Sequence, residues 1–102
     1  MNIDLNAVYA KSADIYLSQM EDEYIMVVVD PKKINRPNEL YILNKTGLEV
    51  WERLNGKTPL IEILQQITSK YNSVPDEQIR QDVLALVNDL FSLNMIVIAK
   101  DR

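Results

Sequence analysis

The side chains of this chain that could do chemistry are mainly carboxylates, since the sequence contains no histidine and no cysteine. It therefore lacks the commonest general base, the commonest transition-metal ligand, a thiol nucleophile and any disulfide. Carboxylates could still act as acids and bases or hold magnesium, provided that several converge from different elements. The acidic run Glu21-Asp22-Glu23 is typical of a solvated turn instead, because adjacent side chains point apart. We therefore expect no enzymatic activity, no catalytic residue, no bound metal and no cofactor.

The only basic cluster of the sequence lies in a proline-containing loop between residues 30 and 38. Its residues Lys32, Lys33 and Arg36, beside Pro37, could meet an acidic peptide or a phosphate, although such clusters are usually solvated. The whole chain has a net charge of −4 and a pI near 4.7. This charge weighs against nucleic-acid binding, because affinity for a phosphate backbone comes largely from clustered Lys and Arg. The expected partner is a protein or a peptide.

Length and composition are those of one folded domain with one core: 102 residues, 47% apolar and 25% charged, with two glycines and four prolines. The sequence has no run of about 18 apolar residues, so we expect no membrane span. The amino terminus, Met1 to Asn6, has neither a basic start nor an apolar core. A secretory signal is therefore not expected, and the expected location is the cytoplasm.

Three strands are predicted in the first half of the chain, over residues 15–20, 24–29 and 39–43. The second is a continuous apolar run rich in β-branched residues, which is typical of a central strand. In a meander the third strand pairs with the central one and leaves its other edge without a protein partner. That edge could accept a peptide as an added strand, be solvated, or be closed by the N-terminal arm or by a second copy of the chain. Residues 1–12 alternate only weakly, so an extra edge strand, a docked arm and a mobile tail all stay open.

Two helices are predicted to follow closely. Asn44 is a good N-cap for the first, over residues 45–54, in which apolar residues recur at helical spacing and Trp51 is expected in the core. Asn55-Gly56 tolerates positive φ and is predicted to end this helix. Thr58-Pro59 is predicted to begin the second helix at once, over residues 59–71, with the Thr58 hydroxyl as its cap.

The longest predicted element is a third helix over residues 76–93, for which Pro75 suits the first turn. Its apolar residues cover more than one stripe, whereas a narrow stripe suffices to cover one face of a small core. The surplus around Leu84, Val87 and Phe91 could line a groove, complete the core or form a dimer contact.

The expected fold class is α+β and winged-helix-like: a three-stranded antiparallel meander followed by three helices, with a short C-terminal strand over residues 95–99. Asn94 is the predicted left-handed stop before that strand. A single domain is expected over residues 13–99, preceded by an arm or extra strand (1–12) and followed by a polar tail (100–102).

Several turn and core positions of the sequence resemble the PqqD-like family. They are Leu43-Asn44, Trp51, Asn55-Gly56-Lys57-Thr58, Glu62-Ile63, Asp82-Val83 and Leu90, and the resemblance covers roughly Ile15 to Ile98. Members of that family are small peptide chaperones, also called precursor-peptide recognition elements. This chain departs from the family pattern in its longer loop before residue 39 and in Asn94, where glycine is usual.

The resemblance implies that the leader of a ribosomally made precursor peptide adds antiparallel to the third strand and lies between that strand and the third helix. The module then delivers its peptide to a modifying enzyme, often a radical S-adenosylmethionine enzyme, or to a leader protease. Carried onto this chain, the peptide-binding residues would be Leu40, Tyr41, Ile42, Leu43, Arg80, Leu84, Val87 and Phe91. Arg80 could pair with an acidic leader side chain or be solvated.

Two other functions are compatible with the same order of elements. A winged-helix transcription regulator would place a helix in the major groove, but the predicted third helix carries four carboxylates against one arginine, which is the wrong charge for DNA. A structural subunit could instead form a homodimer by pairing its sheet edges, because an open edge also invites self-association.

Overall fold

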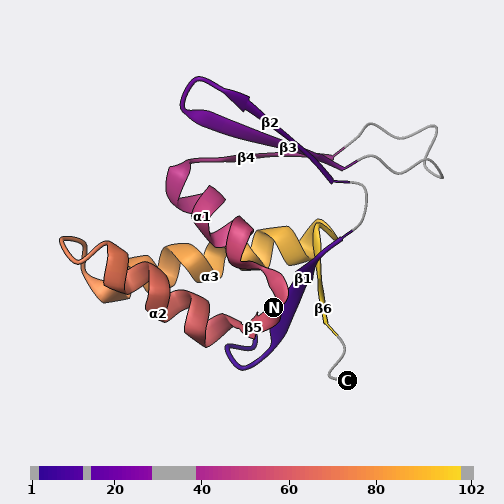
Figure 1. Cartoon of the computed structure of the whole chain (residues 1–102). Helices are drawn as coiled ribbons and strands as arrows, with labels where there is room; N and C mark the ends of the chain where they lie inside the picture. The colour runs from indigo at the N-terminus through magenta and orange to yellow at the C-terminus, as the bar shows by residue number, and fades with distance from the viewer. Residues whose placement is uncertain (1–2, 13–14, 29–38, 100–102) are drawn as a thin grey trace.

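A computed structural model describes residues 3–12, 15–28 and 39–99 of the chain (Figure 1). In chain order its elements are β1 (Val8–Lys11), β2 (Ile15–Met20), β3 (Glu23–Val28), β4 (Glu39–Leu43), α1 (Lys45–Arg53), β5 (Asn55–Pro59), α2 (Leu60–Lys70), α3 (Asp76–Ser92) and β6 (Ile96–Ile98). The predicted α+β class, with a meander followed by three helices and a terminal strand, is confirmed. The basic loop predicted around Lys32, Lys33 and Arg36 lies outside the described residues.

Strands β2, β3 and β4 form an antiparallel sheet with β3 in the centre, as its apolar sequence predicted. In the register of this sheet Met26 of β3 lies opposite Leu17 of β2 and Tyr41 of β4. Side chains alternate between the two faces of a strand. Met26 is fully buried, whereas Ile42 is 50% exposed. The face that carries Met26 and Tyr41 therefore turns toward the helices, and the other face turns outward.

A second sheet, with the order β5-β1-β6, was not predicted. The segment that the sequence left open contributes its central strand, because β1 pairs antiparallel with both β5 and β6. Residues Asn55–Pro59 belong to β5, whereas Asn55-Gly56 was predicted only to end one helix and Thr58-Pro59 to begin the next. In such a short polar segment, apolar and polar residues do not alternate clearly enough to predict a strand. The segment is a strand because its backbone pairs with β1.

The predicted cap of α2 is wrong. Pro59 occupies the N-cap position and no side chain caps the helix. The amides at its start instead donate to the backbone of the N-terminal arm: Leu60 N lies 3.0 Å from Ala7 O, and Ile61 N lies 2.8 Å from Leu5 O. The first amides of a helix have no partner within the helix. Here a distant segment satisfies two of them, which a local capping rule cannot predict.

The predicted start of α1 and the predicted start and stop of α3 are confirmed, whereas α1 ends at its C-cap Leu54, just before the predicted stop at Asn55-Gly56. The Asn44 side chain caps α1 by accepting from Gly47 N at 2.8 Å. Gly56 has a φ of 78°, and a Cβ added there would lie 3.3 Å from Ala10 Cβ. Asn94 has a φ of 62° and follows α3 as the predicted left-handed stop. Pro75 precedes α3, and Asp76 lies in the favourable first turn of that helix.

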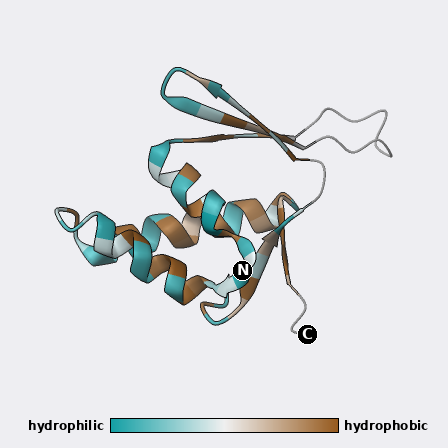
Figure 2. Cartoon of the chain, viewed as in Figure 1, coloured by the Kyte–Doolittle hydropathy of each residue, from teal (hydrophilic) through white to brown (hydrophobic). Residues whose placement is uncertain are grey.

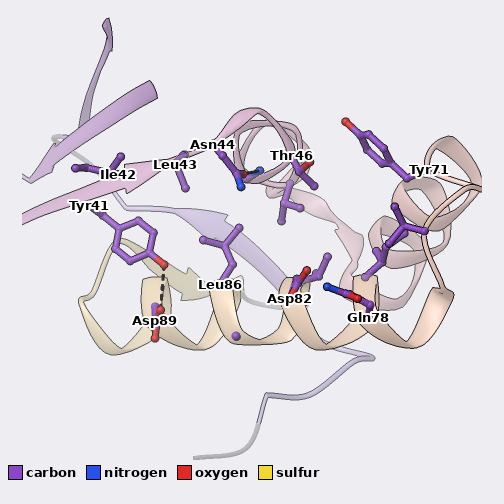
Figure 3. A pocket seen from close by; sticks show the side chains of 16 residues that line it. Tyr41, Ile42, Leu43, Asn44, Thr46, Tyr71, Gln78, Asp82, Leu86 and Asp89 are labelled. Carbon is purple, nitrogen blue, oxygen red and sulfur yellow. Dashed lines mark hydrogen bonds between the residues drawn. The ribbon is translucent and has the colours of Figure 1, made fainter. Parts of the chain in front are cut away.

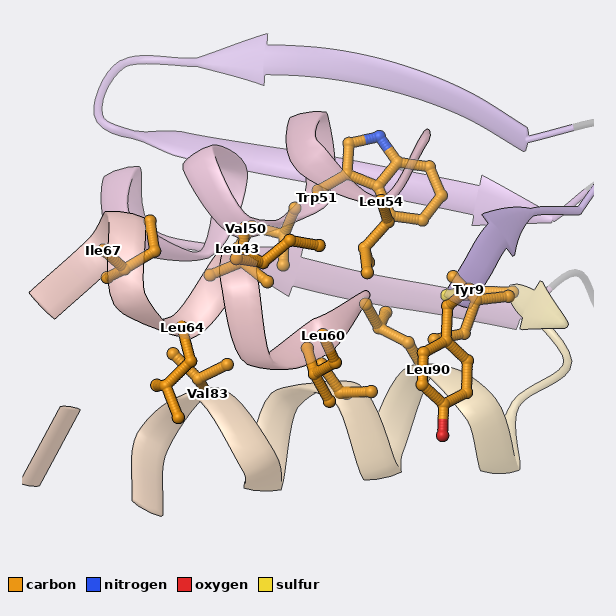
Figure 4. Packing of buried hydrophobic residues seen from close by; sticks show 14 of the residues in the cluster. Tyr9, Leu43, Val50, Trp51, Leu54, Leu60, Leu64, Ile67, Val83 and Leu90 are labelled. Atoms are coloured by element: carbon orange, nitrogen blue, oxygen red, sulfur yellow. The ribbon is translucent and has the colours of Figure 1, made fainter. Parts of the chain in front are cut away.

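One hydrophobic core joins the helices to both sheets (Figure 4). Hydrophobic and hydrophilic residues alternate along the ribbons of α2 and α3 (Figure 2). The predicted core position of Trp51 is confirmed, since this residue is 5% exposed. The buried residues of the core are Tyr9, Met26, Leu43, Val50, Trp51, Leu54, Leu60, Ile63, Leu64, Ile67, Ile79, Val83, Val87, Leu90, Met95 and Ile96. In the described part of the chain, no helix is both long and apolar enough to cross a membrane.

Candidate functional site

Strand β4 has one edge that is available to a partner. It pairs with β3 on one side, and within the described residues no strand pairs with its other side. Such an edge presents unpaired backbone N–H and C=O groups. Because β4 leads directly into α1 through the Asn44 cap, its position relative to the helices is set by the packing of α1.

The register shows which residues of β4 present these groups. Met20 and Glu23 flank the two-residue turn between β2 and β3 and are therefore taken as a hydrogen-bonded pair. Such pairs alternate with non-bonded pairs along antiparallel strands. By this alternation Tyr41 bonds to Met26, which lies opposite it. We infer that the next residue, Ile42, directs its N–H and C=O out from the open edge.

A groove of about 500 Å³ lies between β4, the start of α1 and α3 (Figure 3). Its apolar floor comes from core residues such as Val50, Ile79 and Val83. The lining residues are Tyr41, Ile42, Leu43, Asn44, Thr46, Gly47, Val50, Tyr71, Val74, Gln78, Ile79, Asp82, Val83, Ala85, Leu86 and Asp89. The groove therefore lies between the open strand edge and one face of α3.

Tyr41 links the two walls of this groove. Its ring points from β4 toward α3, and its hydroxyl donates to Asp89 Oδ2 at 3.0 Å (Figure 3). Burial of the phenol, together with this hydrogen bond and the nearby carboxylate charge, raises the pKa of Tyr41 to about 12. The phenol is therefore neutral at physiological pH and acts as a hydrogen-bond donor to the helix.

An ionic cluster around the buried carboxylate of Glu49 lies at the end of the groove that Tyr71 lines. The Tyr71 hydroxyl donates to Glu49 Oε2 at 2.6 Å, and Lys70 Nζ lies 2.9 Å from Glu49 Oε1. Glu49 is only 7% exposed, and Arg53 lies 3.8 Å from it. Hydrogen bonds from Tyr71 and then Lys70 lower the pKa of the Glu49 carboxyl. This cluster fixes the Tyr71 ring, and it was not predicted because its members are spread over two helices and a helix end.

The lining residues can bind a ligand by hydrogen bonds, charge and apolar contact. Their polar side chains are amides, hydroxyls and the two carboxylates of Asp82 and Asp89. Among the described residues, no group of three or more Asp and Glu side chains is placed to hold a metal ion. The groove therefore offers hydrogen-bonding groups, two carboxylates and an apolar floor side by side.

The structure brings some of the predicted peptide-binding residues together. Tyr41, Ile42 and Leu43 line the groove. Leu40 is 57% exposed and, by the alternation of the strand, its side chain lies on the outer face of the sheet. These four residues all belong to the strand with the open edge.

The predicted helix residues, in contrast, do not line the groove. Val87 is fully buried in the core, and Phe91 packs edge-on against Tyr9 with ring centroids 6.0 Å apart. Leu84 packs against the core from a partly buried position, and Arg80 is half-buried elsewhere on α3. The surplus apolar residues of α3 therefore pack in or against the core. Strand β1, which the sequence did not place, contributes Tyr9 to the same core.

The side of α3 that faces β4 carries Gln78, Asp82, Ala85, Leu86 and Asp89. Their spacing of three and four residues does define one helical face. Sequence reasoning missed this face because its mixture of polar and apolar residues is typical of solvated surface.

The family model of Coenzyme PQQ synthesis protein D (PqqD) matches residues 26–96. None of the curated proteins compared with the chain matches it. A solved structure described as TbiB1 in complex with the TbiA(beta) leader peptide is similar, with a TM-score of 0.64 and 17% identity. The similarity covers 85% of this chain and 93% of that chain, and at this identity it shows a shared fold.

Proposed function

Because the chain belongs to the PqqD family, we propose that it is a non-catalytic module that binds the leader of a ribosomally made precursor peptide. The observation that carries the proposal is the open edge of β4 beside a groove of about 500 Å³. The similar structure of TbiB1 holds a leader peptide, which supports the same class of ligand here.

In the proposed complex the leader lies antiparallel to β4 and extends its sheet. Backbone groups of Leu40 and Ile42 bond to the peptide, and the side chains on one face of the peptide enter the groove. Strand addition of this kind obtains affinity from main-chain hydrogen bonds and specificity from pockets for alternate side chains. On the helix side, Asp82, Leu86 and Asp89 replace the residues that the sequence suggested, because they line the groove.

Delivery to an enzyme completes the proposed role. The family resemblance implies a radical S-adenosylmethionine enzyme or a leader protease as the acceptor. In this proposal the groove supplies groups that bind the leader, and the partner enzyme carries out the modification.

A second candidate function is a homodimer that pairs the β4 edges of two copies. The observation that favours it is the outer face of the same sheet, where Tyr16 is 64% exposed, Leu40 is 57% exposed and Ile42 is 50% exposed. Apolar side chains gathered on one face are common at protein interfaces. In such a dimer the edge would be closed to a leader.

Isothermal titration distinguishes these functions. The purified chain is titrated with synthetic leader segments of the short open reading frames beside its gene. The test variant is Ile42→Pro, which removes a donor from the open edge of β4. The matched control is Leu17→Pro, which by the same alternation removes a donor from the outer edge of β2. Both variants are first shown to be folded by circular dichroism.

We expect one leader to bind with micromolar affinity or better, to bind at least about tenfold more weakly to Ile42→Pro, and to bind unchanged to Leu17→Pro. If no leader binds and sedimentation shows a tight dimer that Ile42→Pro dissociates, the peptide-binding proposal is wrong and the dimer is favoured.

A further inference from the structure

The charge of the groove is one-sided. Its two acidic lining residues are Asp82 and Asp89, on the same face of α3, and the described residues that line it include no Lys or Arg. Asp89 already accepts from the Tyr41 hydroxyl through Oδ2. Asp82 is exposed and has no hydrogen-bond or ion-pair partner among the described residues. An unpaired carboxylate therefore stands beside an apolar floor.

We propose that this groove selects leader segments in which a Lys or Arg stands among apolar residues, with the cation placed over Asp82. The inference rests on the proposed function, since it names the chemistry of the peptide that the same groove would bind. Of the two alternatives for Arg80, pairing with an acidic leader side chain is not part of this proposal, because Arg80 does not line the groove.

The spacing of the carboxylates fits an extended peptide. Seven residues of α-helix separate Asp82 from Asp89 along the axis by about 10 Å. Side chains on one face of an extended chain recur about every 7 Å. A long, flexible basic side chain can bridge the difference, so the two carboxylates lie opposite peptide positions that are about two to four residues apart. Asp89 is partly occupied by Tyr41, which makes Asp82 the primary position.

The selection acts through rejection as much as through attraction. A peptide that lies across the groove removes water from the carboxylate of Asp82. If the peptide places a neutral or acidic side chain there, the carboxylate loses hydration without gaining a partner, which costs free energy. A Lys or Arg compensates that loss, and Arg can do so with two parallel hydrogen bonds. The net charge of −4 also attracts a basic peptide over longer distances.

The test uses a display library of short random peptides selected on the full chain. Selected peptides are then synthesised and titrated into the wild type, Asp82→Asn and Asp89→Asn. Asparagine has the shape of aspartate without the charge, and at position 89 it keeps an acceptor for the Tyr41 hydroxyl. The matched control is Glu77→Gln, which removes one charge from an exposed position of α3 that does not line the groove.

We expect Lys and Arg to be enriched in the selected peptides, and Asp82→Asn to weaken their binding by up to about fivefold. Asp89→Asn should weaken it less, Glu77→Gln should leave it unchanged, and added salt should reduce the difference between wild type and Asp82→Asn.

Two results would overturn this inference and leave the proposed function standing. In the first, selected peptides bind more weakly to Ile42→Pro but contain no enriched Lys or Arg. In the second, neither Asp82→Asn nor Asp89→Asn changes their affinity. A selection without any enriched peptide, together with failure of every natural leader to bind, would contradict both.

Discussion

The Tyr41 hydroxyl on β4 donates to Asp89 Oδ2 on α3 at 3.0 Å, across the groove that separates strand from helix. This bond joins residues that are 48 positions apart in the sequence. It sets the direction of the Tyr41 ring, and with it the shape of the groove beside the open edge. The charge state of either partner should therefore affect this wall of the groove.

The pKa of Tyr41 is the most direct test of that contact. It is raised to about 12 by burial, then by the bond to Asp89 and the charge of Asp89. The folded state thus favours the neutral phenol, so the contribution to stability is complete below pH 10 and is lost as pH rises from 10 to about 12. NMR titration of ring-labelled tyrosine should show this late transition. Asp89→Asn should lower the pKa of Tyr41 only part of the way to 10, because burial remains; an unchanged pKa would contradict the contact.

Stability in acid should depend on the cluster around Glu49. Because Tyr71 and Lys70 lower the pKa of Glu49, the folded state favours the carboxylate. The resulting stabilisation is complete above the ordinary pKa of 4.5 and is lost as pH falls through the lowered value. Urea unfolding at a series of pH values should show wild type losing stability relative to Glu49→Gln below about pH 4.5. If the free energies of unfolding of wild type and Glu49→Gln changed with pH in the same way, the Glu49 cluster would not be the source of this pH dependence.

Trp51 should be among the most costly residues to truncate. It is 5% exposed within the core, and Lys11 Nζ lies 5.2 Å from its ring centroid. Trp51→Ala is expected to lower the free energy of unfolding by about 3–5 kcal/mol, through lost burial and the cavity left behind. The control Tyr16→Ala removes an aromatic ring that is 64% exposed and should change the free energy by at most about 0.5 kcal/mol. Similar losses in both variants would contradict the assigned core.

The N-terminal arm should stabilise the start of α2. Removal of residues 1–7 takes away the carbonyls of Leu5 and Ala7, which accept from Ile61 N and Leu60 N. Amide hydrogen exchange should then show loss of protection at Leu60 and Ile61, while Leu64, whose amide is bonded within the helix, serves as the internal control. Protection that survives truncation would show that the arm does not cap this helix.

Much of the fold was predictable because its signals are local. The apolar run around Met26 indicated a central strand, and Asn44 and Asn94 marked a helix start and a helix stop through their own backbone and side-chain preferences. The open edge of β4 also followed from the order of three strands in a meander. Such signals act between residues that are close in sequence, so a short window contains them.

The second sheet and the helix wall of the groove were not predictable in the same way. Residues Asn55–Pro59 become a strand only because β1 pairs with them, and β1 lies more than forty positions earlier. The sequence left open whether the apolar surplus of α3 lines a groove, completes the core or forms a dimer contact. In the structure Val87 is buried in the core and Phe91 packs against Tyr9. The face of α3 that borders β4 carries Asp82, Leu86 and Asp89 instead.

The sequence by itself therefore determined the α+β class, the family, the main helix boundaries and the strand that carries the open edge. The class, the helix boundaries and the strand depend on periodicity, capping or turn preference within a few residues, whereas the family follows from a resemblance to the PqqD-like pattern at separate turn and core positions. Only the tertiary structure decided which face of α3 borders that edge, that Tyr41 reaches Asp89, and that the groove carries carboxylates without a basic side chain among its described lining residues. The physical reason is that the rotation of α3 is set by how the whole core packs, and β1 and the N-terminal arm are part of that core.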